Sequence, residues 1–149
     1  MLEKATDSAI LHVCQNLRET DWMELSLTHW PDVDIAQTFI CVPGAKYAVL
    51  RNGVPVCVFG VVPIFPNVGQ AWLVGTDEIG KSGVEVLRAC RTVINTLMNG
   101  HMHRIQAFSA SFYTQAHRWL ENVGFHQEST LSKFGKDGSD FLVFAVTKR

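Results

Sequence analysis

A short amphipathic segment that ends in Gly-Phe constrains the fold of this chain more than any other feature of its sequence. Four apolar residues within residues 113–125 recur at the spacing i, i+3, i+4, i+7, which places them on one helix face: Ala116, Trp119, Leu120 and Val123. Gly124 follows, and glycine readily adopts the left-handed backbone that ends many helices. Phe125 then starts a predicted strand. The segment therefore predicts a helix that turns directly into a strand.

Length and composition predict one globular domain that spans residues 1–149. The chain has 149 residues, of which 47% are hydrophobic and 18% charged, a balance typical of globular rather than disordered proteins. Its net charge is −1, without a basic block or stripe. This charge pattern does not favour binding to nucleic acid or to an anionic membrane.

The four cysteines and the apolar runs indicate in which cellular compartment the protein is expected. No two cysteines form a Cys-x-x-Cys pair and each lies in an apolar stretch, so we expect small buried hydrophobes in a reducing compartment. Residues 1–7 are polar and lack the apolar core of a secretory signal. The longest apolar run, residues 54–65, is interrupted by Pro55, Gly60 and Pro63 and is too short to span a bilayer. We expect a soluble protein made in a cytoplasm.

The N-terminal third predicts short helices. Thr6 is a suitable N-cap for a first helix, and either Asp32 or Asp34 is suited to start another. Between them, residues 17–24 are polar and charged, which predicts either a connector or a second helical piece.

The middle of the chain predicts an antiparallel meander. Three β-rich segments follow one another, over residues 47–50, 54–62 and 70–75. The dipeptide Asn52-Gly53 between the first two is the strongest short hairpin signal in the sequence. Residues 63–69 predict a loop. Because consecutive strands with short connections pair antiparallel, these segments form the first part of a sheet.

The C-terminal half predicts a crossover connection, in which a helix joins two parallel strands. The predicted elements are a long helix over residues 84–99, a strand over 104–109, the helix described above, and strands over 125–134 and 141–146. A strand–helix–strand connection joins parallel strands, so we expect a mixed sheet with helices on both faces.

This element order, together with residues 113–125, resembles the GNAT superfamily of acetyl-CoA-dependent N-acetyltransferases from residue 47 onward. The resemblance implies an α/β (α+β) fold with a mixed, mostly antiparallel sheet, and acetyl-CoA as the only cofactor. In GNAT enzymes, amides at the start of the long helix bind the cofactor pyrophosphate. The corresponding residues here are Gly75, Gly80, Lys81, Ser82 and Gly83. A turn in which Ser82 caps the helix is the alternative interpretation of the last four.

Several positions depart from the GNAT pattern. The pyrophosphate loop of the superfamily reads Arg/Gln-x-x-Gly-x-Gly/Ala, and this sequence has Ile79, Ser82 and Val84 at those positions. The tyrosine that protonates the coenzyme A thiolate corresponds to Leu120, and the asparagine at the start of that helix corresponds to Tyr113. The resemblance therefore implies a degenerate acetyl-CoA site, that of a pseudoenzyme.

Few other residues are candidates for catalysis or metal binding. Asp77 and Glu78 are weak candidates for a general base, or else parts of a solvated turn. Tyr113 is a weak candidate for an acid, or else a stacking residue at a helix start. His101 and His103 form a His-x-His pair without further ligands nearby in sequence, so no metal site is predicted.

Four segments show a narrower resemblance, to GNAT-like proteins of tailed bacteriophages, some of which are internal virion proteins. The segments are residues 17–24, 71–77, 118–125 and 140–146. It implies synthesis in the host cytoplasm, phage virion proteins as partners, and a structural role in the internal core or at the head–tail junction of the virion. The alternatives are an active acetyl-CoA-dependent N-acetyltransferase acting on a host protein or small amine, and an anti-host binding protein.

Overall fold

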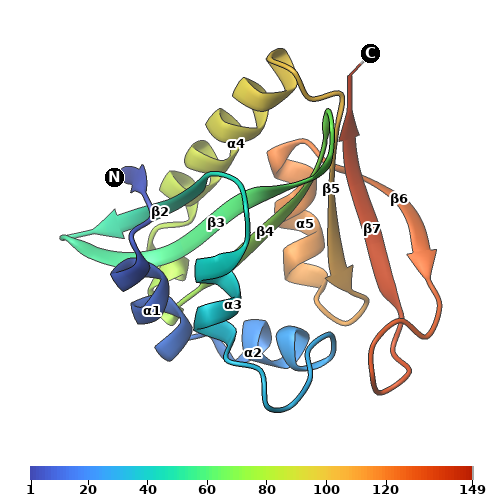
Figure 1. Ribbon diagram of the computed structural model, residues 1–149, viewed down its shortest axis with the longest axis horizontal. Coiled ribbons are helices and arrows are strands. Elements are labelled where there is room, and N and C mark those ends of the chain that lie inside the picture. The colour runs from blue at the N-terminus through green and yellow to red at the C-terminus, as the bar shows by residue number, and fades with distance from the viewer. Residues whose placement is uncertain (149) are drawn as a thin grey trace.

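A seven-stranded mixed sheet of order β1-β2-β3-β4-β5-β7-β6 forms the centre of the computed structural model, which describes residues 1–148 (Figure 1). The strands are β1 (Leu2–Lys4), β2 (Lys46–Arg51), β3 (Val54–Phe65), β4 (Val68–Gly75), β5 (Arg104–Ala110), β6 (His126–Leu131) and β7 (Phe141–Thr147). The helices are α1 (Asp7–Gln15), α2 (Glu19–Ser26), α3 (Ile35–Cys41), the 3-10 helix η1 (Asp77–Lys81), α4 (Gly83–Asn99) and α5 (Thr114–Val123). The predicted fold class is confirmed.

Most predicted helix starts are confirmed by their caps. The Thr6 side chain accepts a hydrogen bond from the Ala9 amide, and Asp34, rather than Asp32, accepts one from Gln37. The polar residues 17–24 mostly form α2, the second of the two alternatives. Strand β1 was not predicted, because three exposed residues carry no readable period.

The meander is confirmed, with one correction. Asn52 and Gly53 both have positive φ angles, 53° and 79°, as a two-residue hairpin turn requires. The loop predicted over residues 63–69 is wrong, because β3 continues to Phe65 and β4 begins at Val68. A register shift between Pro63 and Phe65 accommodates the proline within the hairpin.

The crossover through α4 produces the only parallel pairing among the described residues. Strands β4 and β5 pair over three positions, Val68↔Arg104 to Gln70↔Gln106. Every other neighbouring pair of strands is antiparallel. Beyond Gln70 the two strands separate and form a V, which is open towards the end of the sheet where α2 lies (Figure 1).

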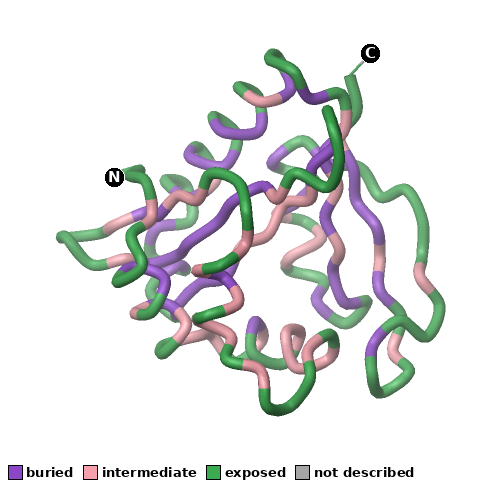
Figure 2. The backbone as a smooth tube through the Cα atoms, in the orientation of Figure 1, coloured by how far each residue is buried: buried purple, intermediate pink, exposed green. Residues whose placement is uncertain are grey.

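Two apolar clusters hold helices on the two faces of the sheet. Helices α4 and α5 pack on one face through residues such as Val86, Ile94 and Leu120, against Ile105 and Phe144 of the strands. Helices α1 and α3 pack on the other face, over β2 to β4. Burial follows this arrangement, with buried stretches along β3, β5 and β7 and along one side of α4 (Figure 2).

The cysteine prediction is correct in part. All four cysteines are free, and Cys57 and Cys90 are buried, whereas Cys14 is half-buried and Cys41 is exposed. Within residues 1–148 no helix is both long and apolar enough to cross a bilayer.

We expect Ile105→Ala to lower the free energy of unfolding by about 2–5 kcal/mol, because this side chain is fully buried in the core under α4. The matched control is Ile64→Ala on β3, where the side chain is 44% exposed and the loss should stay below about 0.5 kcal/mol. Urea denaturation measures both variants. Similar losses in the two would contradict the assigned core.

Candidate functional site

Helix α2 lies across the open end of the V and is bonded to both separated strands (Figure 1). On the β4 side, the amide of Gly75 donates to Oδ2 of Asp21 at 2.8 Å. The carbonyl of Gly75 accepts from the amide of Arg18 at 2.9 Å. Both polar backbone groups of Gly75 are therefore occupied by the segment that starts α2.

The same segment fixes Asp21 in place. The Arg18 guanidinium donates to both carboxylate oxygens of Asp21, with Nη2 at 3.0 Å from each. Asp21 is only 6% exposed and lies in the first turn of α2, where the helix dipole favours a negative charge. A buried carboxylate is stable only when paired and hydrogen-bonded, and here both conditions hold.

The β5 side is bonded in the same way. The amide of Ala110, the last residue of β5, donates to Oε2 of Glu24 at 3.1 Å. The carbonyl of Ala110 accepts from the amide of Tyr113 at 3.0 Å, and Nε2 of His117 lies 2.9 Å from the same oxygen. Both strand ends of the V thus have their terminal polar groups satisfied internally.

Tyr113 joins this network from the start of α5. Its hydroxyl donates to Oδ1 of Asp21 at 2.8 Å and accepts from Oγ1 of Thr20 at 3.0 Å. Burial, followed by the negative charge of Asp21, raises the pKa of Tyr113 to about 12. We call Arg18, Asp21, Glu24 and Tyr113 the α2 clamp.

Within the α2 clamp, Glu24 is the group that titrates near neutral pH. Burial, as the largest cause, raises its pKa to about 7, and the charge of Asp21 acts in the same direction. The Ala110 amide and the Arg18 charge act in the opposite direction. A half-buried carboxylate with a pKa close to 7 is suited to accept a proton from a bound amine.

The sequence predicts a connector or a helical piece over residues 17–24 but does not predict the α2 clamp. The available signal was the spacing Arg18-x-x-Asp21-x-x-Glu24, which puts three charged residues on one helical face. A charged face is usually solvated, and only the fold shows that this one is turned towards the strands.

The start of α4, where the cofactor residues are predicted, has a different character. Ser82 occupies the N-cap position but makes no capping hydrogen bond, so the alternative in which its side chain caps the helix is wrong. Its Oγ is buried without a hydrogen-bond partner. Gly80 and Gly83 face open space where a side chain would project.

Charges around this helix start are mixed. The exposed Lys81 ammonium lies 3.6 Å from the Glu78 carboxylate, and Arg51 donates to the Lys81 carbonyl at 2.9 Å. The Met1 ammonium pairs with Glu85 in the first turn of α4.

The two parts of the predicted acetyl-CoA site therefore differ in their fit to that cofactor. The start of α4 fits a phosphate, because it offers first-turn amides, the unpartnered Ser82 hydroxyl and nearby Lys81. The V does not fit a ligand that needs the polar backbone groups of Gly75, because both are occupied.

Of the remaining candidate residues, only Glu78 contacts either place, through its ion pair with Lys81. Asp77 and Glu78 are exposed on η1. Leu120, which the resemblance aligns with the acid, is buried in the apolar cluster between the sheet and helices α4 and α5. His101 and His103 are exposed, and no group of three potential metal ligands occurs within residues 1–148.

Comparison with solved structures shows the fold. The chain superposes on a ribosomal-protein-alanine N-acetyltransferase from Brucella melitensis with a TM-score of 0.79 and 14% identity over 99% of each chain. It is also similar to a GNAT-family acetyltransferase from Bacillus anthracis (TM-score 0.74, 18% identity, 98% of this chain and 93% of that one). The ribosomal-protein-S18-alanine N-acetyltransferase from Escherichia coli gives a TM-score of 0.74 and 13% identity over 99% of this chain and 92% of that one. The sequence matches no protein-family model and no curated protein. The chain thus has the fold of GNAT N-acetyltransferases.

We expect the stability of the protein to fall as pH rises through about 7, because Glu24 then becomes charged in a half-buried position. Its pKa is higher in the folded than in the unfolded chain, so its contribution is complete below about pH 4.5 and lost above 7. The loss is on the order of 3 kcal/mol. Glu24→Gln should remove this part of the pH dependence, whereas Glu19→Gln, on the exposed side of α2, should keep it. Urea denaturation from pH 5 to 8 measures the slopes, and equal slopes in the two variants would refute the assignment.

Proposed function

We propose that this chain is a phage-encoded GNAT-fold protein whose acetyl-CoA site is degenerate and which acts as a component of the virion, in the internal core or at the head–tail junction. Its partners would be other virion proteins. The scaffold would then serve binding and assembly rather than acetyl transfer, since a fold alone does not fix an activity.

The observation that carries the proposal is the α2 clamp across the V. Gly75 and Ala110 terminate the two separated strands, and their amides donate to Asp21 and Glu24. A ligand entering between the strand ends would have to displace these carboxylates and leave the Arg18 charge without its partner. That displacement opposes ligand binding between the strand ends.

Leu120, which the resemblance aligns with the acid, and Tyr113, the weak candidate for an acid, support the same proposal. Leu120 is an apolar core residue and has no proton to donate. The Tyr113 phenol, with a pKa of about 12, is bonded to Asp21 in the α2 clamp. Neither residue is suited to protonate a leaving thiolate.

The proposed phage origin rests on the segments that resemble phage proteins. One of them, residues 17–24, supplies three of the four residues of the α2 clamp. The feature that closes the V therefore lies in a part of the sequence that carries the resemblance.

A second candidate function is an acetyl-CoA-dependent N-acetyltransferase acting on a host protein or a small amine. The observation that favours it is Glu24, whose pKa of about 7 suits a general base at the open end of the V. Bound acetyl-CoA would supply the activated acyl group, with its phosphates at Lys81, Ser82 and Gly83. Glu24 would accept the proton of the amine that attacks the thioester carbonyl, and the C–S bond would break with coenzyme A leaving as its thiolate.

Calorimetry with acetyl-CoA, together with mass spectrometry of purified virions, tests the first proposal. We expect no binding at millimolar acetyl-CoA and the protein to be present in particles. Binding at micromolar affinity that weakens in Lys81→Ala would refute the degenerate site. Absence of the protein from purified virions would refute the virion role.

The second candidate predicts acetyl transfer to an amine panel that includes an alanine N-terminal peptide, because two similar structures are named as ribosomal-protein-alanine N-acetyltransferases. Glu24→Gln should then lower kcat/KM by about 100-fold or more, with the loss of a rate increase near pH 7. Glu19→Gln is the control. If Glu24→Gln retains the full rate and pH profile, Glu24 is not the base.

A further inference from the structure

Helix α2 is attached to the rest of the molecule more by polar bonds than by buried apolar side chains. Of its residues Glu19–Ser26, all of which the structure describes, Asp21 alone is buried. Trp22 and Met23 are 54% and 45% exposed, and Leu25 is partly buried against the apolar cluster under α1 and α3. An element with little apolar burial opens at a lower free energy than the core does.

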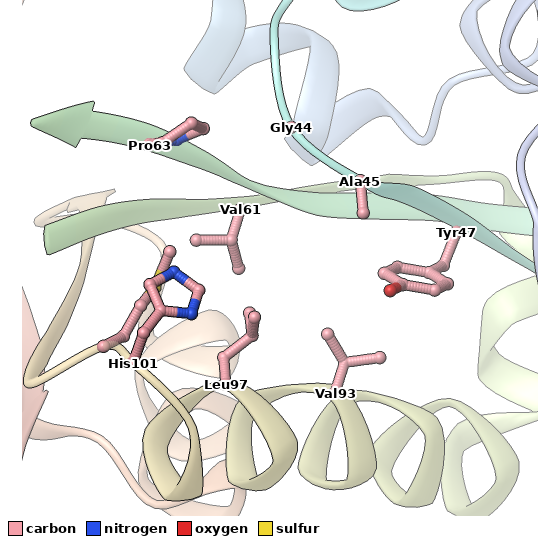
Figure 3. A pocket seen from close by; sticks show the side chains of 9 residues that line it. Gly44, Ala45, Tyr47, Val61, Pro63, Val93, Leu97 and His101 are labelled. Carbon is pink, nitrogen blue, oxygen red and sulfur yellow. The ribbon is translucent and has the colours of Figure 1, made fainter. Parts of the chain in front are cut away.

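Helix α4 is attached in the opposite way. Val93 and Leu97 point from this helix towards Val61 of β3 (Figure 3). Val86 and Ile94 of the same helix are buried in the core. Moving α4 would therefore expose apolar core to water, whereas moving α2 mainly exchanges polar bonds within the protein for bonds to water.

The α2 clamp contains two carboxylates but one cation. Nη2 of Arg18 lies 3.0 Å from both carboxylate oxygens of Asp21, so that residue matches its charge. Burial, followed by the charge of Asp21, raises the pKa of Glu24. The Ala110 amide, the Arg18 charge and the buried Ser109 side chain lower that pKa by a smaller amount. When Glu24 is ionised, the α2 clamp carries two negative charges and one positive charge.

Helix α5 presents two further titratable groups to this place. The Tyr113 hydroxyl donates to Asp21 at 2.8 Å, and burial, as the largest cause, raises its pKa to about 12, so it stays neutral at physiological pH. Nε2 of His117 lies 2.9 Å from the carbonyl oxygen of Ala110, the residue whose amide donates to Glu24. Any pH dependence of α2 must therefore be assigned between Glu24 and His117 by experiment.

We propose that α2 is a lid over the V, which is closed when Glu24 holds a proton and opens when Glu24 is ionised. In the closed lid with Glu24 protonated, one carboxylate charge is paired with one guanidinium. Ionisation adds a second buried carboxylate charge without a second guanidinium in the α2 clamp, which is costly. Opening returns that charge to water and uncovers the amides of Gly75 and Ala110. The lid follows from the contacts of the closed V and does not depend on the proposed function.

The direction of the pH effect follows from the two states of Glu24. Its pKa is about 7 in the closed lid, and solvent returns it towards the ordinary value of 4.5 in the open lid. The closed lid therefore has its full advantage from Glu24 below about pH 4.5 and has lost it above about pH 7. Each pH unit between the two pKa values changes the ratio of open to closed lid about tenfold, so the ratio should rise about 50-fold from pH 5 to pH 8.

Thiol labelling of a Ser109→Cys variant tests the lid, because this position is 2% exposed and lies beside Glu24. The reaction of each cysteine with N-ethylmaleimide is followed by mass spectrometry and divided by the rate of a model thiol at the same pH. Cys57 is the internal reference, since it is fully buried in the core and reacts only when the core unfolds. We expect the introduced thiol to react faster than Cys57, at a rate that low urea concentrations do not change and that is about 50-fold higher at pH 8 than at pH 5.

Three further substitutions assign the pH dependence. Glu24→Gln should remove it, because glutamine still accepts a hydrogen bond from the Ala110 amide but does not ionise. Glu19→Gln, on the exposed side of α2, and His117→Gln, beside Ala110, should each retain it. A pH dependence that survives Glu24→Gln, or one that is lost in His117→Gln, would overturn the proposal.

A second reporter keeps the test valid if Ser109→Cys does not fold. Ala110→Cys places the thiol at the neighbouring position, which is fully buried and whose amide donates to Glu24. It should show the same excess over Cys57 and the same rise with pH. Labelling no faster than that of Cys57 at every pH would show that α2 opens only with the core, which would overturn the proposal. Acetyl-CoA plays no part in these measurements, so their failure is distinct from failure of the proposed function.

Discussion

The buried carboxylate of Asp21 is the interaction on which the arrangement of this molecule most depends. It joins three parts of the chain that are far apart in sequence: the start of α2, the end of β4 at Gly75 and the start of α5 at Tyr113. A buried negative charge costs several kcal/mol in lost hydration, which the Arg18 guanidinium and the two further hydrogen bonds offset. Because β4 and β5 pair over only three positions, this carboxylate and Glu24 supply the polar link across the rest of the V.

The two parts of the predicted acetyl-CoA site differ in the polar groups that they leave available to a ligand. At the start of α4, the unpartnered Ser82 hydroxyl and the open space at Gly83 leave donors free. At the V, the donors and acceptors at the strand ends are used to hold α2. Polar groups therefore remain unpaired at the start of α4, whereas at the V the side chains of α2 bond to the strand ends.

Local signals in the sequence predicted most of the elements but not their contacts. The i, i+3, i+4, i+7 pattern of residues 113–125 and the dipeptide Asn52-Gly53 were sufficient because helix faces and tight turns are properties of neighbouring residues. The extension of β3 through Pro63 was missed, because a register shift depends on the partner strand. The α2 clamp was missed for a similar reason, since Asp21 meets Gly75 across 54 residues and no periodicity encodes such a distance.

The short parallel ladder between β4 and β5 has a consequence for how the native state opens. The antiparallel unit of β1 to β4 and the unit of β5, β7 and β6 each carry long ladders of their own, but only three residue pairs join them. Amide hydrogen exchange detects local opening at a boundary between two such units. The amides of Gly75 and Ala110 lie where the two units part, and they are protected by carboxylates rather than by a strand. Their exchange rates therefore report directly on whether the two halves of the sheet move together or independently.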